Sequence, residues 1–326
     1  MIISAKSLSR LYKGAIHFGI NRRYLSAYRF SRAQIEYMSS DGYEPYWLGR
    51  ALISGPERID LKTDATKISF EYKASEPHPR SNTVDLYIDG ALRDVYFIKD
   101  RLKGTVEFTL PEGAKRVSIY LPCESIFKIK NFTINGHYRA IPKCKRSMLI
   151  IGDSITQGAG PDISSEAYAN ILARELGVEV VAQGIGGYRY EPRDVMRFEG
   201  IDPDIVMVAL GTNCYDVGAL ERDGYDYERA VNEFYDRLDS TYHDKKIVAL
   251  TPIFRTAELD MARFLWCIDK IRSACQRHNI TVIDGLKMMP NLPICLADGV
   301  HPSTYGSHML GMRLSAELKR IVSGEK

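Results

Sequence analysis

The sequence predicts a two-part fold: an all-β sandwich of jelly-roll type over residues 1–142, followed by a three-layer α/β/α domain over residues 143–326. Short segments of the first part alternate apolar and polar residues, which is the period of half-buried strands. From about residue 145 onward, short apolar runs alternate with longer segments of helical spacing. A chain of 326 residues is also long enough for about two domains, each with its own hydrophobic core.

The first part contains strand signals separated by turn signals. The alternating segments are 68–72, 84–88, 106–110 and 117–121. The pairs Asp89-Gly90, Glu112-Gly113 and Asn135-Gly136 fall between or after them, and such pairs favour tight turns. Short strands at this spacing are typical of a β-sandwich, here of jelly-roll type.

The second part alternates predicted strands and helices. The strands are expected at 148–151, 178–181, 204–210, 246–250 and 281–284, and the helices at 164–176, 227–242, 259–277 and from near Ser303 onward. Strands joined by helices of this length form a parallel sheet with helices on both faces. We therefore expect a flavodoxin-like domain with a five-stranded parallel sheet.

Composition and missing motifs exclude several function classes. The net charge of +3 comes from 44 basic and 41 acidic residues spread along the chain, so a nucleic-acid partner is not expected. No run of 18 apolar residues predicts a membrane span, and the first twenty residues lack the pattern of a signal peptide. The six cysteines show no CxxC pair and no metal-ligand spacing with the seven histidines, which predicts reduced thiols in the cytoplasm and no metal site. No phosphate-binding motif is present either, so no cofactor is expected.

Four short polar blocks follow the apolar runs of the second part. The first runs from Gly152 to Gly158 with the sequence GDSITQG, and the others are GIGG at 184–187, GTN at 211–213 and DGVHP at 298–302. Ser154 stands at the end of the first buried strand, where open α/β sheets bind their ligands. A serine hydroxyl needs a neighbouring base to become a nucleophile, and Asp298 and His301 are close enough in sequence for one loop to present both.

In this order, the four blocks resemble those of the SGNH (GDSL) hydrolase superfamily, over roughly residues 145–326. The resemblance implies a metal-free esterase with Ser154 as nucleophile, His301 as base and Asp298 as its partner. It also implies an oxyanion hole formed by the Ser154 N–H, a glycine N–H of the second block and the Asn213 side chain. Aligning the preceding strand places the glycine donor at Gly187, with Gly184 as the alternative.

Two positions depart from the family pattern. Cys214 follows Asn213 where an acidic residue is common, and Gln183 stands near a usual asparagine. We interpret Cys214 as a buried thiol, Asp153 as a structural residue that binds local backbone, and His308 as a partly exposed helix residue, with replacement of His301 as base the alternative. No GxSxG motif supports the α/β-hydrolase family, although the order Ser, Asp, His also occurs there.

The expected substrate is a small ester, most simply an acetylated saccharide. A β-sandwich ahead of an SGNH domain resembles certain two-domain carbohydrate acetylesterases. Aromatic and basic residues that follow the strands could contact the sugar: Tyr188, Tyr190, Tyr215, Phe254 and Arg255. The alternatives are a lysophospholipase or thioesterase with the same site, and a non-catalytic carbohydrate-binding protein. The sequence leaves open the acyl length, a homo-oligomeric state, and whether the sandwich itself binds sugar.

Overall fold

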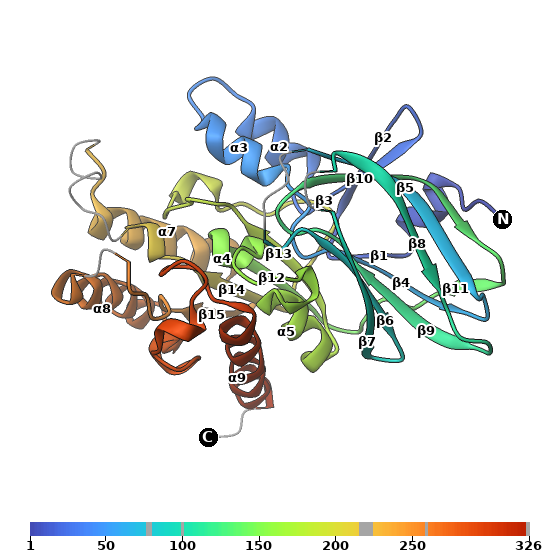
Figure 1. The fold of residues 1–326 in the computed structure, drawn as a ribbon. Helices are drawn as coiled ribbons and strands as arrows, with labels where there is room; N and C mark the ends of the chain where they lie inside the picture. Colours follow the sequence, from blue (N-terminus) through green and yellow to red (C-terminus); the bar gives the residue numbers. More distant parts are fainter. Residues whose placement is uncertain (76–79, 99–100, 215–223, 258–259, 324–326) are drawn as a thin grey trace.

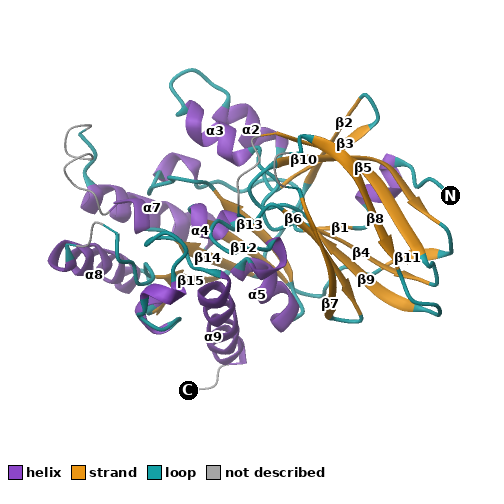
Figure 2. Cartoon of the chain, viewed as in Figure 1, coloured by secondary structure: helices purple, strands orange, loops and turns teal. Residues whose placement is uncertain are grey.

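The protein consists of a β-sandwich beside an α/β domain (Figures 1 and 2). The computed structural model describes residues 1–75, 80–98, 101–214, 224–257 and 260–323. Both predicted classes of structure are present, because the strands of the first part pair antiparallel whereas those of the second part form a five-stranded parallel sheet.

Two antiparallel sheets form the sandwich. One has the order β1 (Tyr12–Lys13), β4 (Arg58–Thr63), β9 (Lys115–Tyr120), β6 (Thr83–Ile88) and β7 (Ala91–Phe97), with β11 (Tyr138–Ala140) also paired to β4. The other has the order β2 (His17–Asn21), β3 (Tyr24–Tyr28), β10 (Ile126–Ile134), β5 (Lys67–Ser75) and β8 (Lys103–Thr109). Apolar residues from both sheets, including Ile59, Leu61, Phe70 and Ile129, are buried in one core between them.

Turn chemistry and alternation explain why these segments form strands. Asp89 and Gly90 join β6 to β7 with positive φ angles of 51° and 84°, a conformation that suits a two-residue hairpin turn. In β5, Ile68, Phe70 and Tyr72 are buried whereas Lys67 and Lys73 are exposed. The period of two therefore places one face of this strand in the core.

The α/β domain has three layers. Its sheet has the order β13 (Glu179–Gly184), β12 (Ser147–Gly152), β14 (Ile205–Ala209), β15 (Lys246–Leu250) and β16 (Thr281–Ile283). Helices α7 (Tyr227–Tyr242) and α8 (Met261–Arg277) share a core with Leu149, and helices α5 (Tyr168–Leu176) and α9 (Thr304–Ser323) share another with Met148 and Ile150. Consecutive residues of β12 thus face opposite helical layers, as expected for a strand buried on both faces.

Three helices lie within the part that was predicted to contain only strands: α1 (Ala5–Ser9), α2 (Arg32–Met38) and α3 (Pro45–Ala51). Helix α2 begins with a capping box between Ser31 and Gln34, and α3 begins with Pro45 at its first position. Both local signals can be read from the sequence. The strands β1–β4, β7, β10 and β11 were not predicted either.

The segment around α2 and α3 lies between β3 and β4 of the sandwich in sequence, but it packs against the α/β domain. Phe30, Met38 and Ala51 belong to the same core cluster as Leu149. The guanidinium of Arg29, which is fully buried, donates hydrogen bonds of 2.7 and 2.8 Å to the carbonyls of Ala182 and Gly184 in β13. A division of the chain at residues 142 and 143 remains a prediction, and these contacts join the two sides of it.

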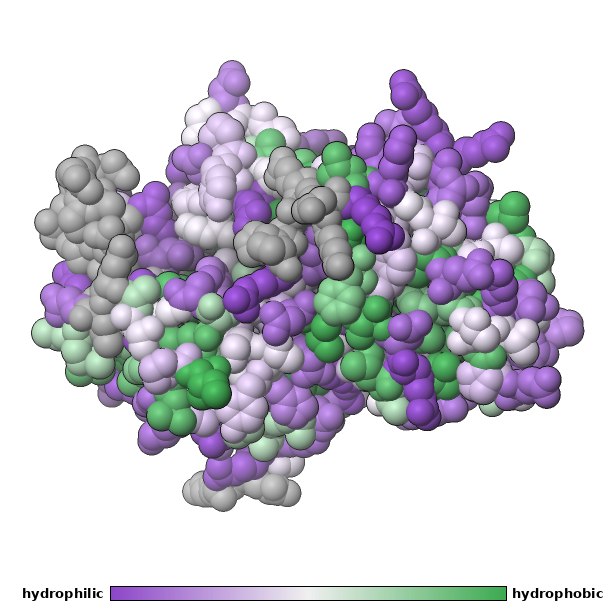
Figure 3. Space-filling model, viewed as in Figure 1, coloured by the Kyte–Doolittle hydropathy of each residue, from purple (hydrophilic) through white to green (hydrophobic). Residues whose placement is uncertain are grey.

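The surface and the thiols complete the description. On the face shown in Figure 3, hydrophilic and hydrophobic residues are interspersed over both parts of the molecule. All six cysteines lie in described parts of the chain and are free thiols, five of them buried. Within the described ranges, no helix has the length and apolar character needed to cross a membrane.

Candidate active site

Ser154 lies where the central strand β12 gives way to the short helix α4 (Ser154–Gln157). Asp153 caps this helix, since its Oδ1 accepts a 3.0 Å hydrogen bond from the Ile155 N–H. The turn is so tight that a Cβ atom on Gly152 would lie 2.0 Å from Thr156 Oγ1, so only glycine fits there. The close turn leaves Ser154 at the carboxyl edge of the sheet.

Ser154, His301 and Asp298 form a continuous chain of hydrogen bonds. The distance from Ser154 Oγ to His301 Nε2 is 2.8 Å, and the distance from His301 Nδ1 to Asp298 Oδ2 is also 2.8 Å. Asp298 Oδ1 accepts the backbone N–H groups of Val300 and His301 at 3.0 and 2.8 Å. Partial burial of Asp298 opposes its ionisation, but these hydrogen bonds outweigh it and hold the pKa of Asp298 below its ordinary value.

The loop that carries Asp298 and His301 is held by neighbouring segments. The Gly299 carbonyl accepts the N–H groups of Thr256 and Ala257 at 2.8 and 3.0 Å. The Arg255 guanidinium donates to the carbonyls of Ala257 and Thr212 at 3.1 and 3.0 Å. Arg255 therefore connects the segment that holds the Asp298–His301 loop to the loop that contains Asn213. The Arg255 side chain is buried and binds backbone, and its contact with substrate stays a prediction.

The second and third blocks follow the two strands that flank β12. Gly152 pairs in register with Gly184 of β13 and Ala209 of β14, so the three strands end at the same edge of the sheet. Asn213 lies in the short 3₁₀ helix Thr212–Cys214, and its Nδ2 donates a 3.0 Å hydrogen bond to the Tyr188 carbonyl. An amide nitrogen has two N–H groups, so this bond orients Asn213 and leaves one donor for a ligand.

The two candidate glycines have different surroundings. Gly187 has a φ of 74° in the loop after β13, and its N–H makes no hydrogen bond within the described residues. Gly184 is instead the last residue of β13, and a Cβ atom there would lie 2.1 Å from the Gln157 nitrogen of α4. Gly184 thus permits the packing of α4 against the strand, whereas the Gly187 N–H has no acceptor among the described residues, and its role as oxyanion donor stays a prediction.

Gln157 connects this loop to the sandwich. Its Oε1 accepts the Gly186 N–H at 2.9 Å, and its Nε2 donates to Glu124 Oε1 at 2.5 Å. Glu124, which follows β9, also forms an ion pair with Arg50 of α3 at 3.2 Å. Residues far apart in sequence therefore hold the glycine loop from two sides.

Two tyrosines expected to stack on a sugar are buried instead. The side chains of Tyr188 and Tyr190 are 3% and 1% exposed. The Tyr188 hydroxyl donates to Asp194 Oδ2 at 2.5 Å, and the Tyr190 hydroxyl donates to the Leu210 carbonyl at 3.3 Å. The expectation of stacking is wrong for both rings, because no face is open to solvent.

The other two aromatic candidates, Phe254 and Tyr215, stay predictions. Phe254 is partly buried and packs against the core cluster that contains Met148 and Ile150. Tyr215 lies outside the described residues.

Helix α3 supplies the aromatic residues that the sequence analysis missed. Trp47 Nε1 donates to the Gly187 carbonyl at 3.3 Å. A Cβ atom on Gly187 would lie 3.2 Å from Tyr46 Cε1, and the Tyr46 side chain is 56% exposed. No local pattern signals this contact, because 140 residues separate Trp47 from Gly187.

The other titratable groups near the site behave as structural residues. Burial raises the pKa of Asp153 to about 6, although the Ile155 N–H and His301 oppose the shift. Burial also raises the pKa of the Cys214 thiol to about 12, so it is not an activated nucleophile. His308 Nδ1 lies 2.9 Å from Glu166 Oε2, and the partner of Ser154 is His301. Among the residues that the structure describes, no group of three histidine, cysteine or acidic side chains could hold a metal ion.

Comparison with known proteins identifies the family of the α/β domain. Residues 150–309 match the model of the GDSL-like Lipase/Acylhydrolase family. No curated protein matches the sequence.

Three solved structures resemble nearly the whole chain. A protein described as a GDSL-like lipase from Bacteroides ovatus has 16% identity and a TM-score of 0.76, covering 99% of this chain and 98% of its own. The salicylyl-acyltransferase SsfX3 of a tetracycline biosynthetic pathway has 18% identity, a TM-score of 0.74, and coverage of 95% and 94%. A family two carbohydrate esterase from Cellvibrio japonicus has 17% identity, a TM-score of 0.67, and coverage of 99% and 98%. At these identities the likeness shows a shared two-part fold.

Proposed function

Because residues 150–309 form a GDSL-like lipase/acylhydrolase domain, we propose that this protein is a serine esterase that removes short acyl groups, chiefly acetyl, from carbohydrates. The observation that carries the proposal is the hydrogen-bond chain from Ser154 through His301 to Asp298, with both side-chain distances at 2.8 Å. This arrangement suits a serine nucleophile, its base and the carboxylate that orients the base.

In this mechanism Ser154 Oγ attacks the ester carbonyl while His301 Nε2 takes its proton. The N–H groups of Ser154 and Gly187 and the Asn213 side chain stabilise the oxyanion. The tetrahedral intermediate then collapses to an acyl-enzyme, and His301 gives the proton to the departing alcohol. A water molecule, activated by the same imidazole, releases the acid and restores Ser154. Asp298 stays ionised throughout and stabilises the protonated imidazole.

The proposed carbohydrate specificity rests on Tyr46. Its ring is exposed and borders Gly187, so it can contact the alcohol part of a bound ester. A tyrosine can stack on a sugar face and hydrogen-bond its hydroxyls at low conformational cost. The resemblance in fold to family two carbohydrate esterases supports the same substrate class.

One observation favours longer acyl chains as a second candidate. Leu292 and Ile294 are 53% and 73% exposed and lie in the segment that leads into the His301 loop. Ser303, just after this loop, donates from its hydroxyl to the Ile294 carbonyl, which ties that apolar segment to the loop. An acyl chain lying on these side chains would make the protein a lysophospholipase or thioesterase.

A series of aryl esters with acetyl, butyryl and octanoyl groups separates the two candidates. We expect Ser154→Ala to abolish hydrolysis of every ester, while Ser240→Ala on the exposed surface of α7 keeps the wild-type rate. Rates that fall steeply from acetyl to octanoyl support the acetylesterase, and rates that rise support the longer-chain candidate. Substantial hydrolysis by a folded Ser154→Ala protein would contradict the mechanism itself.

The carbohydrate assignment has its own test. Tyr46→Ala should reduce kcat/KM for an acetylated oligosaccharide more than for a simple aryl acetate, because only the sugar reaches the ring. Tyr305→Ala, which also removes an exposed tyrosine from a helix, is the matched control. Equal losses on both substrates would remove the support that Tyr46 gives to a carbohydrate substrate.

A further inference from the structure

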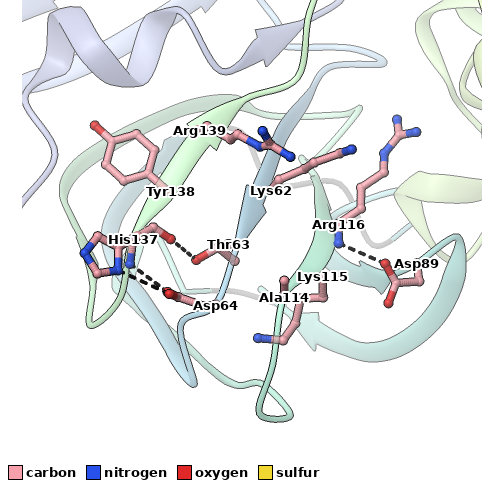
Figure 4. A pocket seen from close by; sticks show the side chains of 10 residues that line it. All are labelled: Lys62, Thr63, Asp64, Asp89, Ala114, Lys115, Arg116, His137, Tyr138 and Arg139. Carbon is pink, nitrogen blue, oxygen red and sulfur yellow. Dashed lines mark hydrogen bonds and ion pairs between the residues drawn. The ribbon is translucent and has the colours of Figure 1, made fainter.

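The β-sandwich carries an open groove that the proposed mechanism does not use. Its cavity volume is about 640 Å³, within the range of small-molecule sites. The groove lies over β4, β9 and β11 of the sandwich, whereas Figure 1 shows α4 in the α/β domain, away from these strands. Its lining residues are Lys62, Thr63, Asp64, Asp89, Ala114, Lys115, Arg116, His137, Tyr138 and Arg139 (Figure 4).

Three cations lie side by side across the groove. Arg139 of β11 pairs in register with Lys62 of β4, and Lys62 pairs with Arg116 of β9. Neighbouring strands are about 4.8 Å apart, so the row spans roughly 10 Å. Like charges directly opposite each other on a sheet are destabilising unless an anion lies near them.

The protein supplies little negative charge to this row. Arg116 lies 3.2 Å from Asp60, but Asp60 is buried and is shared with Arg58, also at 3.2 Å. Within the described ranges, Lys62 and Arg139 form no ion pair.

The two carboxylates that line the groove are already bound to other groups. Asp64 accepts the His137 N–H at 2.7 Å, with its second oxygen 3.2 Å from the ring, and Asp89 accepts the Arg116 backbone N–H at 2.9 Å. Of the three cations, Arg116 therefore has one ion-pair partner, Asp60, and Lys62 and Arg139 have none within the described ranges.

A pair of facing cations alone would not indicate a site. Lys73 of β5 and Lys103 of β8 also pair in register and are exposed, as Lys62, Arg116 and Arg139 are, but they lie outside the groove. The row of Lys62, Arg116 and Arg139 differs because it lines a cavity that also contains an aromatic ring and two carboxylates.

The mixture of groups in the groove indicates the class of anion. Tyr138 and His137 lie on one side of the row and Asp89 on the other (Figure 4). Arginine matches the planar shape of a carboxylate and can bind it through two parallel hydrogen bonds. Carboxylates such as Asp64 and Asp89 can accept hydrogen bonds from sugar hydroxyls, which a chain of phosphates does not offer.

We propose that this groove binds an acidic oligosaccharide, with the carboxylates of its uronic acid residues on Lys62, Arg116 and Arg139. The hydroxyls of the sugar reach Asp64 and Asp89. This function is independent of Ser154, so it stands or fails separately from the proposed esterase activity. A groove distant from the reacting serine would hold a charged polysaccharide to the enzyme.

Calorimetric titration of the full chain with a trimer of galacturonic acid tests the proposal. We expect saturable binding that weakens with added salt and drops by about tenfold or more in the Lys62→Gln, Arg139→Gln double variant. Lys73→Gln, Lys103→Gln is the matched control and should bind like wild type. Both double variants should keep wild-type hydrolysis of an aryl acetate, which also shows that they fold.

Four results would overturn the proposal. The first is no binding of the uronic acid trimer by the wild-type chain, and the second is an equal loss of binding in the two double variants. The third is equally tight binding of the neutral trimer cellotriose, which would exclude carboxylate recognition. The fourth is tighter binding of a phosphate polymer, which would assign the groove to a different class of anion.

Discussion

The side-chain amide of Gln157 donates a 2.5 Å hydrogen bond to the Glu124 carboxylate. Gln157 stands three residues after Ser154, and Glu124 follows a strand of the sandwich. The other end of the same amide accepts the Gly186 N–H, one residue before the proposed oxyanion donor. The sandwich therefore fixes the geometry of the glycine loop, and this contact can be tested.

Removing the Glu124 carboxylate should impair turnover. We expect Glu124→Ala to lower kcat by roughly 10-fold to 100-fold with little change in KM, because a small displacement of Gly187 weakens oxyanion binding. Glu124→Gln keeps an acceptor oxygen and should restore much of the rate. Glu107→Ala, which removes an exposed carboxylate from β8, is the control. A Glu124→Ala enzyme with unchanged kcat would show that the contact does not position the loop.

Asn213→Ala should lower kcat by about 100-fold to 1,000-fold, the usual cost of one oxyanion donor. KM should change little, because the lost hydrogen bond is strongest in the transition state. Steady-state kinetics with an aryl acetate measure both constants. Asn232→Ala on the surface of α7 should have no effect. If Asn213→Ala raised KM alone, Asn213 would be a residue of ground-state binding.

Glu57 should make the stability of the protein depend on pH. Its side chain is 1% exposed, and neither carboxylate oxygen has a hydrogen-bond partner within the described residues. Burial raises the pKa of Glu57 from 4.5 to about 8, although the charge of Arg29 opposes the shift. Between pH 4.5 and about pH 8, Glu57 loses its proton in the unfolded chain but keeps it in the folded protein. The stability that the folded protein gains from holding this proton is therefore complete below about pH 4.5 and is lost as pH rises to about 8.

Urea unfolding at pH 5 and pH 9 measures this effect. Glu57→Gln should gain stability relative to wild type as pH rises, by on the order of 4 kcal/mol over the window. The control is Glu112→Gln in the exposed turn after β8, whose stability difference from wild type should not change with pH. A constant difference between Glu57→Gln and wild type would show that Glu57 ionises in the folded protein as it does in the unfolded chain.

Gly184→Ala should reduce both stability and activity, because its Cβ atom would meet the backbone of α4 at 2.1 Å and displace Ser154. Gly177→Ala is the matched control. Gly177 has a φ of 62°, but no atom lies within 4 Å of its Cβ position. Alanine there should cost about 1 kcal/mol and leave activity unchanged. Thermal unfolding and aryl acetate hydrolysis distinguish the two, and a fully active Gly184→Ala protein would contradict the packing argument.

Strong local patterns predicted most of the α/β domain. Helix α7 (Tyr227–Tyr242) and strand β15 (Lys246–Leu250) begin and end where the sequence predicted, because continuous apolar runs and helical spacing are sustained there. In the sandwich the same method found four strands and missed the others, together with α2 and α3. Strands such as β1 and β11 are two and three residues long, too short for a period to appear.

The sequence by itself determined which residues are candidates for the reaction and their order along the chain. Ser154, Asn213, Asp298 and His301 stand in short motifs next to predicted strands and helices. Only the tertiary structure decided what surrounds them. It buried Tyr188, Tyr190 and Arg255, which the sequence placed near substrate, and brought Tyr46 beside Gly187. The reason is physical: a local pattern reports backbone conformation, whereas the exposure of a side chain depends on packing between segments more than a hundred residues apart.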